Sequence, residues 1–167
     1  MVFIKITLLL GHLDPDFIAL LDETNDRLRE VFRTTNPLTF PVSATGSAGM
    51  EATIVNVLGP GDTVVIGVNG VFGERMCDVA SRCGATVVRV DAEWGQALDP
   101  QDLLDAHPDP KVIAVVHAET STGALTPIEE ISKIVHDAGA LLLLDAVTSL
   151  GGCPVRVDDW QVDAIYS

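Results

Sequence analysis

Short, continuous runs of apolar residues, separated by segments with helical spacing, constrain the fold of this 167-residue chain more than any other feature. The runs predict strands at residues 63–68, 85–90, 112–117, 140–144 and 164–166. The segments between them predict helices at 71–83, 100–106 and 128–138. Strands that are apolar on both faces must be covered on both sides. The alternation therefore predicts an α/β fold with a mostly parallel sheet and helices on both faces.

The first third of the chain predicts two further helices. Asp14-Pro15 is a good helix start, because aspartate caps free amides and proline fits the first turn. Apolar residues then recur at helical spacing to about Thr34, and a short extended run at 38–42 predicts a strand. A second helix follows the small residues at 43–47 and ends at the turn 59–62. No internal repeat or flexible linker interrupts the pattern, so we expect one domain.

Composition and charge exclude several classes of function. Hydrophobic residues make up 47% of the chain, which is enough for one sizeable core. The formal net charge of -14 and the lack of a basic stretch argue against a nucleic-acid partner. Three cysteines without a metal-binding spacing indicate reduced thiols in the cytoplasm. Residues 1–10 form an atypical lead segment, too short to span a membrane and without a cleavage signal.

The first candidate site is Thr45-Gly46-Ser47, which precedes the second helix. Free amides at a helix start favour an anion, glycine permits close approach, and two hydroxyls add hydrogen-bond donors. These residues predict a phosphate cup, although an ordinary helix cap has the same composition. The nucleotide-binding patterns G-x-x-x-x-G-K-[ST] and G-x-G-x-x-G are both absent from the sequence, which disfavours a nucleotide-binding module.

The second candidate is Asp145, which ends the apolar run 140–144. A carboxylate at the end of a buried strand is costly unless it meets a cation or hydrogen-bond donors. A protonated pyridine nitrogen is one such partner, since the carboxylate would keep it protonated. A magnesium ion in a nucleotide hydrolase and a simple turn cap are the alternatives.

Two further loops carry candidate ligand contacts. Residues 119–123, Glu-Thr-Ser-Thr-Gly, follow a strand and serve either a turn or a ligand, and the neighbouring His117 is either structural or a base. Phe72 lies in Asn-Gly-Val-Phe-Gly at 69–73, where it either joins the core or offers its ring to a planar cofactor.

Taken together, these segments resemble the class V aminotransferases, and among them the alanine-glyoxylate and serine-glyoxylate (serine-pyruvate) branch. The resemblance runs from about Gly11 to Ser167. The stretches that carry it are 36–39, 45–47 with 51–52, 69–75, 119–123 and 145–152. It implies the large domain of a fold-type I transferase, pyridoxal 5′-phosphate as cofactor, and transamination between an amino acid such as alanine or serine and a 2-oxo acid such as glyoxylate or pyruvate.

The resemblance also implies roles for single residues. Thr45, Gly46 and Ser47 would hold the cofactor phosphate, and Asp145 would be the catalytic partner of the pyridine nitrogen. Phe72 matches the aromatic position that stacks on the pyridine ring, where this branch often has tryptophan. Val147 would pack against the opposite ring face, and Thr120 would lie near the phenolic oxygen.

Two departures from the family pattern affect the expected activity. Residues 1–10 replace a glycine- and proline-rich opening, and the chain ends before the lysine that holds the cofactor and before the small C-terminal domain. Its lysines are Lys5, Lys111 and Lys133, none at the family position. We therefore expect residues 11–167 to be a partial large domain, inactive alone, from a homodimeric parent. A noncatalytic truncated pseudoenzyme and a fragment of a cysteine desulfurase-like enzyme are the alternatives.

Overall fold

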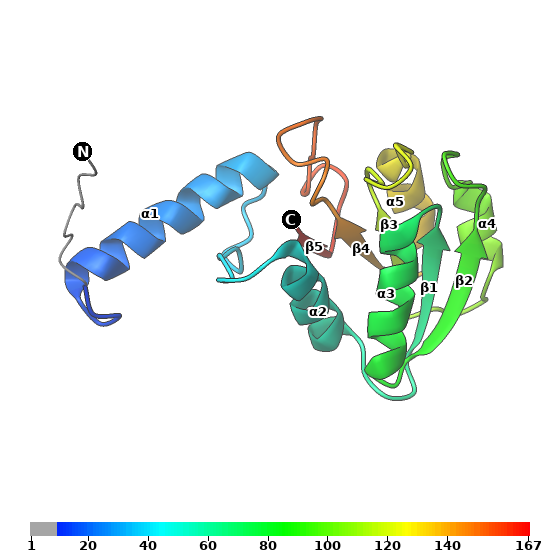
Figure 1. The fold of residues 1–167 in the computed structure, drawn as a ribbon, viewed down its shortest axis with the longest axis horizontal. Helices are drawn as coiled ribbons and strands as arrows, with labels where there is room; N and C mark the ends of the chain where they lie inside the picture. The colour runs from blue at the N-terminus through cyan, green and yellow to red at the C-terminus, as the bar shows by residue number, and fades with distance from the viewer. Residues whose placement is uncertain (1–9) are drawn as a thin grey trace, which may run out of the picture.

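The computed structural model describes residues 10–167, and its centre is a five-stranded sheet in which all neighbouring strands are parallel. The strand order is β2-β1-β3-β4-β5 (Figure 1). The strands are β1 Thr63–Val68, β2 Thr86–Asp91, β3 Val112–Val116, β4 Leu141–Asp145 and β5 Ala164–Tyr166. The predicted parallel α/β architecture is confirmed, with strand bounds that differ from the predicted ones by at most one residue.

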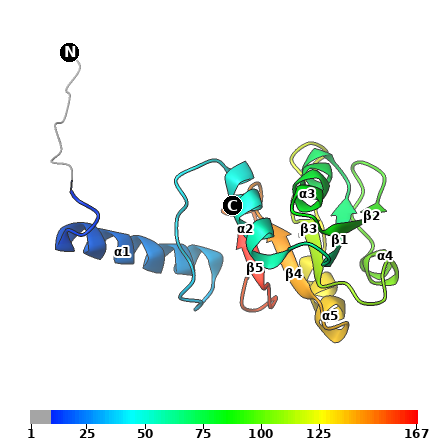
Figure 2. The ribbon, with the colours of Figure 1, turned by 90° about the horizontal axis from the view of Figure 1, so that it is seen from below.

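Helices cover both faces of this sheet. In Figure 2, α2 (Gly46–Val57) and α3 (Val71–Arg82) lie on one side, and α4 (Pro100–Asp105) and α5 (Ile128–Asp137) lie on the other. Successive residues of a strand point to opposite faces, so each strand contributes to both cores. Leu143 packs in the core under α2 and α3, whereas Leu142 and Leu144 pack in the core with α4 and α5.

The first helix, α1 (Pro15–Phe32), begins as predicted but is not buried. The Asp14 carboxylate accepts a hydrogen bond from the Asp16 amide at 2.9 Å and caps the helix start. No residue within α1 is buried, and the helix projects away from the sheet (Figures 1 and 2). Phe32, its last residue, packs against the core. The apolar stripe of α1 therefore predicted the helix correctly, but among the described residues most of this stripe is not packed against another element.

The prediction of a strand at 38–42 is wrong. These residues form no ladder with the sheet, and Leu38, Phe40 and Val42 are exposed. The segment pairs with neither edge strand, β2 or β5, and Pro41 within it has no amide to donate to a strand ladder. The expected lead segment, residues 1–10, lies outside the described residues except for Leu10.

Within residues 10–167, none of the helices combines the length and the hydrophobicity needed to cross a bilayer.

The side chains of β2 are more exposed than those of the central strands, because β2 lies at an edge of the sheet.

The two-sided core predicts the cost of truncating a strand residue. Leu142→Ala removes a side chain with 0% exposure, so the free energy of unfolding should fall by about 2–5 kcal/mol. Leu141→Ala is the matched control, because its side chain is 39% exposed and its loss should cost less than about 1 kcal/mol. Urea denaturation measures both, and equal losses would contradict this description of the core.

Candidate functional site

The candidate site lies at the edge of the sheet where the parallel strands end. The chain reaches this edge after Val68 in β1, Val116 in β3, Asp145 in β4 and Tyr166 in β5. The connection from β1 goes to β2 on one side, and the chain then returns to β3 on the other side of β1. Loops diverge at such a switch point, and open α/β sheets bind ligands there. The segments after β1 and β3 both lie at this point.

Asp145 is a buried carboxylate held by two donors. Its side chain is 3% exposed. The Val147 amide donates to Oδ1 at 2.9 Å, and the Tyr166 hydroxyl donates to Oδ2 at 2.7 Å. Burial raises the pKa of Asp145 and the charge of Glu119 raises it further, while the two hydrogen bonds lower it. Burial also raises the pKa of Tyr166, so its hydroxyl remains a donor.

The start of α2 lies directly against the segment that follows Asp145. A Cβ built on Gly46 would lie 2.8 Å from Cγ2 of Val147, so only glycine fits there without a shift. One turn later, a Cβ on Gly49 would lie 3.3 Å from Cβ of Tyr166. Thr45 to Ser47 and Asp145 to Val147 are therefore neighbours, although about a hundred residues separate them in sequence.

The first amides of α2 have no acceptor within the helix, as in any helix. Thr45 occupies the cap position but makes no side-chain capping hydrogen bond, so its hydroxyl is free for another partner. Glycine at position 46 keeps the backbone accessible. This combination of amide and hydroxyl donors suits an anionic group.

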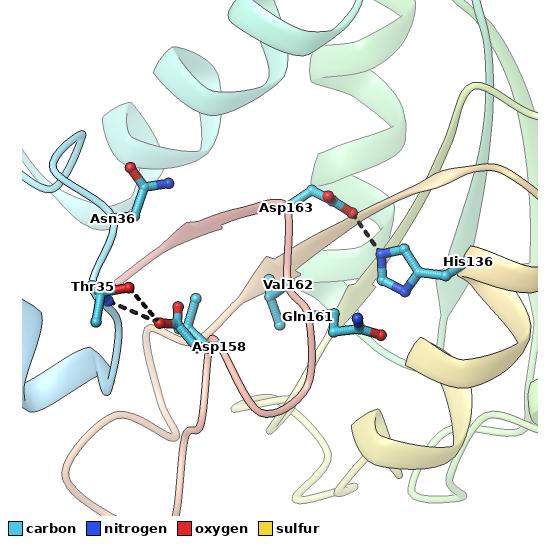
Figure 3. A pocket seen from close by; sticks show the side chains of 8 residues that line it. Thr35, Asn36, His136, Asp158, Gln161, Val162 and Asp163 are labelled. Atoms are coloured by element: carbon cyan, nitrogen blue, oxygen red, sulfur yellow. Dashed lines mark hydrogen bonds and ion pairs between the residues drawn. The ribbon is translucent and has the colours of Figure 1, made fainter.

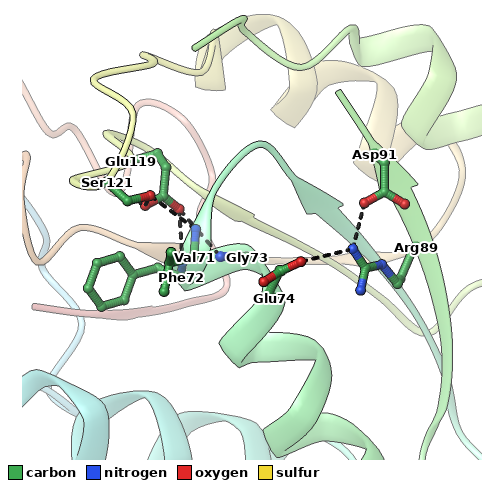
Figure 4. Close-up of polar contacts among 8 residues, drawn as sticks. All are labelled: Val71, Phe72, Gly73, Glu74, Arg89, Asp91, Glu119 and Ser121. Atoms are coloured by element: carbon green, nitrogen blue, oxygen red, sulfur yellow. Dashed lines mark hydrogen bonds and ion pairs between the residues drawn. The ribbon is translucent and has the colours of Figure 1, made fainter. Parts of the chain in front are cut away.

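The loops after β3 and β4 and the start of α3 lie at the same edge of the sheet. The side-chain oxygens of Thr120 and Thr148 are hydrogen-bonded to each other and join the loop after β3 to the loop after β4. Phe72 lies in the first turn of α3, and its amide donates to Glu119 Oε2 at 3.1 Å. Figure 4 shows the Phe72 ring projecting from the helix start on the side opposite the Glu74, Arg89 and Asp91 ion pairs.

Sequence reasoning gave no individual role to three residues at this edge. Tyr166 is the hydroxyl donor to Asp145, Thr148 is the partner of Thr120, and Glu119 is fully buried. A tyrosine at the end of a strand was visible in the sequence, but the β4–β5 register that pairs Asp145 with Tyr166 was not. These contacts depend on which strands are neighbours.

His117 has a structural environment. Its side chain is buried, its ring meets that of Trp160 edge-on with centroids 5.3 Å apart, and burial lowers its pKa. Its Nδ1 has no hydrogen-bond partner among the described residues. The burial and the contact with Trp160 favour the structural interpretation of His117 over that of a base.

A separate open hollow of about 440 Å³ lies at the opposite edge of the sheet (Figure 3). Its polar groups are engaged with one another: Asp158 accepts from the Thr35 amide at 2.9 Å, and His136 Nε2 lies 3.0 Å from Asp163 Oδ2. The hydrogen bonds from Thr34 and Thr35 lower the pKa of Asp158. This hollow marks where the segment after α1 docks, near the amino-terminal ends of β4 and β5.

Comparison with known proteins identifies the family. The family model described as aminotransferase class-V matches residues 9–167. The chain belongs to the class V aminotransferase family. It is 40% identical over 160 residues to (S)-ureidoglycine–glyoxylate transaminase of Bacillus subtilis (strain 168), and 36% identical over 161 residues to alanine–glyoxylate aminotransferase of Callithrix jacchus. Each alignment covers 95% of this chain.

A solved class V structure has the same fold over the same region. The chain matches the crystal structure of alanine–glyoxylate aminotransferase from Nostoc sp. with a TM-score of 0.91 and 51% identity, across 95% of this chain. It spans 42% of that structure, 38% of the Bacillus subtilis relative and 39% of the Callithrix jacchus relative. The described residues thus correspond to about two fifths of a class V aminotransferase.

The close approach of Gly46 to Val147 predicts that a side chain at position 46 would clash with Val147, and that shortening Val147 would relieve the clash. Gly46→Ala should lower the free energy of unfolding by about 1–3 kcal/mol, because Val147 or the start of α2 must shift. Combining it with Val147→Ala removes the clashing methyl groups and should restore most of the loss. Gly152→Ala, with 3.6 Å to its nearest neighbours, is the control, and chemical denaturation distinguishes these outcomes.

The raised pKa of Asp145 predicts a pH dependence of stability. The folded protein holds this proton more tightly than the unfolded chain, so stability should fall as pH rises from the ordinary value of 3.8 through the raised pKa. Asp145→Asn should lack this component when both proteins are denatured with urea at a series of pH values.

Tyr166→Phe provides the companion measurement. It removes a hydrogen bond that lowers the pKa of Asp145, so the decline should extend to higher pH. Identical pH profiles for wild type, Asp145→Asn and Tyr166→Phe would exclude a perturbed Asp145.

Proposed function

We propose that this chain forms the cofactor-binding part of a pyridoxal-phosphate-dependent aminotransferase that transfers an amino group from an amino acid, such as alanine or serine, to a 2-oxo acid. Glyoxylate and pyruvate are the proposed acceptors. The printed names of the Bacillus subtilis and Callithrix jacchus relatives both include glyoxylate, which supports that acceptor. The observation that carries the proposal is the approach of the α2 start to the segment after Asp145.

The donor set fits a phosphorylated pyridine. Asp145 is buried, and none of the ion pairs among the described residues involves it. A protonated ring nitrogen would supply the missing positive charge and offset the cost of burying the carboxylate. The anion-binding start of α2 lies close by, beside Val147. A ligand with a cationic ring nitrogen and an anionic phosphate matches both ends.

Each proposed contact residue then has a defined task. The helix start at Thr45, Gly46 and Ser47 binds the phosphate, and Asp145 holds the proton on the ring nitrogen, with Tyr166 and Val147 orienting its carboxylate. When bound, pyridoxal phosphate supplies an electron sink for reaction at the α-carbon of the amino acid.

The ring and its phenolic oxygen have their own contacts. Phe72 and Val147 are proposed to cover the two ring faces and exclude water from them. The Thr120 hydroxyl would lie near the phenolic oxygen, and its hydrogen bond to Thr148 fixes its orientation. Homodimer formation is part of the proposal, and the exposed apolar residues of α1 and of 38–42 offer a surface that association would bury.

Among the described residues, the buried Cys77 is a poor candidate for the reactive thiol that the cysteine desulfurase-like alternative requires. Burial raises the pKa of Cys77 to about 11, so this thiol is protonated at neutral pH and is a poor nucleophile. Cys153 forms part of a turn through its bridge with Leu150. Sequencing the gene beyond the codon for Ser167 distinguishes the pseudoenzyme alternative from the proposed aminotransferase. A lysine encoded nearby would favour the aminotransferase.

Pyridoxamine 5′-phosphate tests the proposed site directly. It carries the ring and the phosphate but has no aldehyde, so surface lysines do not react with it. Isothermal titration should show saturable binding, weakened about tenfold or more by Asp145→Ala, because a charge-assisted contact is lost. Thr45→Val should also weaken binding. Asp78→Ala, at an exposed position, is the matched control and should leave the affinity unchanged.

The role of lysine is tested by borohydride reduction with pyridoxal phosphate, followed by peptide mapping. Lys111 pairs with Asp62 at the amino-terminal edge of β3, and Lys133 pairs with Glu129 on α5. We expect neither to form a stoichiometric adduct and the 167 residues alone to transfer no amino groups. A stoichiometric adduct with amino transfer would contradict this part of the proposal, as would failure of Asp145→Ala to weaken binding.

A further inference from the structure

Glu119 is the most deeply buried acidic side chain at the carboxyl edge of the sheet, with 1% exposure. None of the ion pairs among the described residues involves it. An uncompensated buried carboxylate is costly, so a side chain retained in this environment must receive strong hydrogen bonds.

Four hydrogen bonds converge on this carboxylate from two segments of the chain. Oε2 accepts from the amides of Phe72 at 3.1 Å and Gly73 at 3.4 Å. Oε1 accepts from the amide of Ser121 at 3.1 Å and from its hydroxyl at 2.7 Å. The Ser121 hydroxyl in turn accepts from the Val71 amide at 3.0 Å. Figure 4 shows this group of contacts.

The contacts replace the ordinary cap of α3. The cap position is Gly70, which has no side chain to bond the first amides. A Cβ at Gly70 would lie 2.4 Å from Cγ of Glu119 and 2.5 Å from Oγ of Ser121, so glycine is what lets the two loops approach. A carboxylate also interacts favourably with the positive end of the helix dipole.

The same carboxylate therefore holds two of the proposed cofactor contacts. Phe72 is the residue whose amide it binds, and Thr120 lies between Glu119 and Ser121 in the chain. Thr120 is anchored on its other side by Thr148. Any change in Glu119 should alter the separation between the Phe72 ring and the Thr120 hydroxyl.

We propose that Glu119 is a positioning residue of the cofactor site, whose buried carboxylate sets the spacing between Phe72 and Thr120. This inference rests on the proposed function. Glu119 does not touch the cofactor but acts through its neighbours. Its negative charge also acts on Asp145, whose pKa it raises, and favours a cationic ring there.

A double-mutant cycle tests this coupling. The variants are Glu119→Ala, Phe72→Leu and the two combined, each titrated with pyridoxamine 5′-phosphate. Glu119→Ala alone should weaken binding about tenfold, but only about twofold once Phe72 is already leucine, because residues that act together are not additive. Equal fold losses in both backgrounds would show a purely general structural role and overturn the proposal.

Circular dichroism of the bound cofactor is the second readout, because its induced band reports how the ring is held. Glu119→Ala should reduce this band at saturating ligand, and Glu119→Gln should give an intermediate band, since its amide oxygen still accepts from one segment while its amide group opposes the donors of the other. An unchanged band in both variants would contradict positioning. Glu129→Ala, at an exposed position on α5, is the matched control.

The outcomes separate this inference from the proposed function. If wild type binds and Asp145→Ala weakens binding, but Glu119→Ala and Glu119→Gln leave affinity and dichroism unchanged, only the role of Glu119 fails. If wild type does not bind pyridoxamine 5′-phosphate, both proposals fail. Should Glu119→Ala not fold, Glu119→Gln and Ser121→Ala carry the test, since Ser121→Ala removes a donor to Glu119 and the acceptor for Val71.

Discussion

Burial of the parallel sheet on both faces is the constraint from which the rest of the structure follows. The central strands carry apolar side chains above and below, and helices seal each side. Polar side chains cannot be placed within such strands at low cost, so they collect where the strands end. Asp145 is an example: in β4, three buried leucines, Leu142 to Leu144, lead to one carboxylate at the edge. The location of the site is a consequence of the way the core is built.

The edge holds two buried carboxylates with different environments. Glu119 receives hydrogen bonds from four donors and is committed to holding α3 and its own loop together. Asp145 receives two, and burial leaves its pKa raised. Two neighbouring negative charges in a region of low polarity favour a cationic ligand, and the less satisfied carboxylate is the one with capacity to bind it. This difference supports the proposal that Glu119 has a structural task and Asp145 a chemical one.

Predictions from the sequence succeeded where the local apolar pattern agreed with the pairing and packing of the whole sheet. The bounds of β1 were predicted to the residue, because an apolar run between turn residues leaves little freedom for a strand. The run at 38–42 is also rich in apolar residues, but Pro41 lacks an amide donor for a strand ladder, and the run forms no strand. The stripe on α1 was read correctly as helical, yet nothing local determines whether another element covers it.

The sequence by itself determined the class of fold and the candidate residues, since apolar periodicity and strand-end polar groups are local properties of the chain. It also carried the resemblance to the class V aminotransferases, and the family is confirmed. The tertiary structure alone decided which residues meet: Gly46 with Val147, Tyr166 with Asp145, and Glu119 with the start of α3. Strand order and register bring these pairs together, and they depend on the packing of the whole sheet, which no single segment encodes.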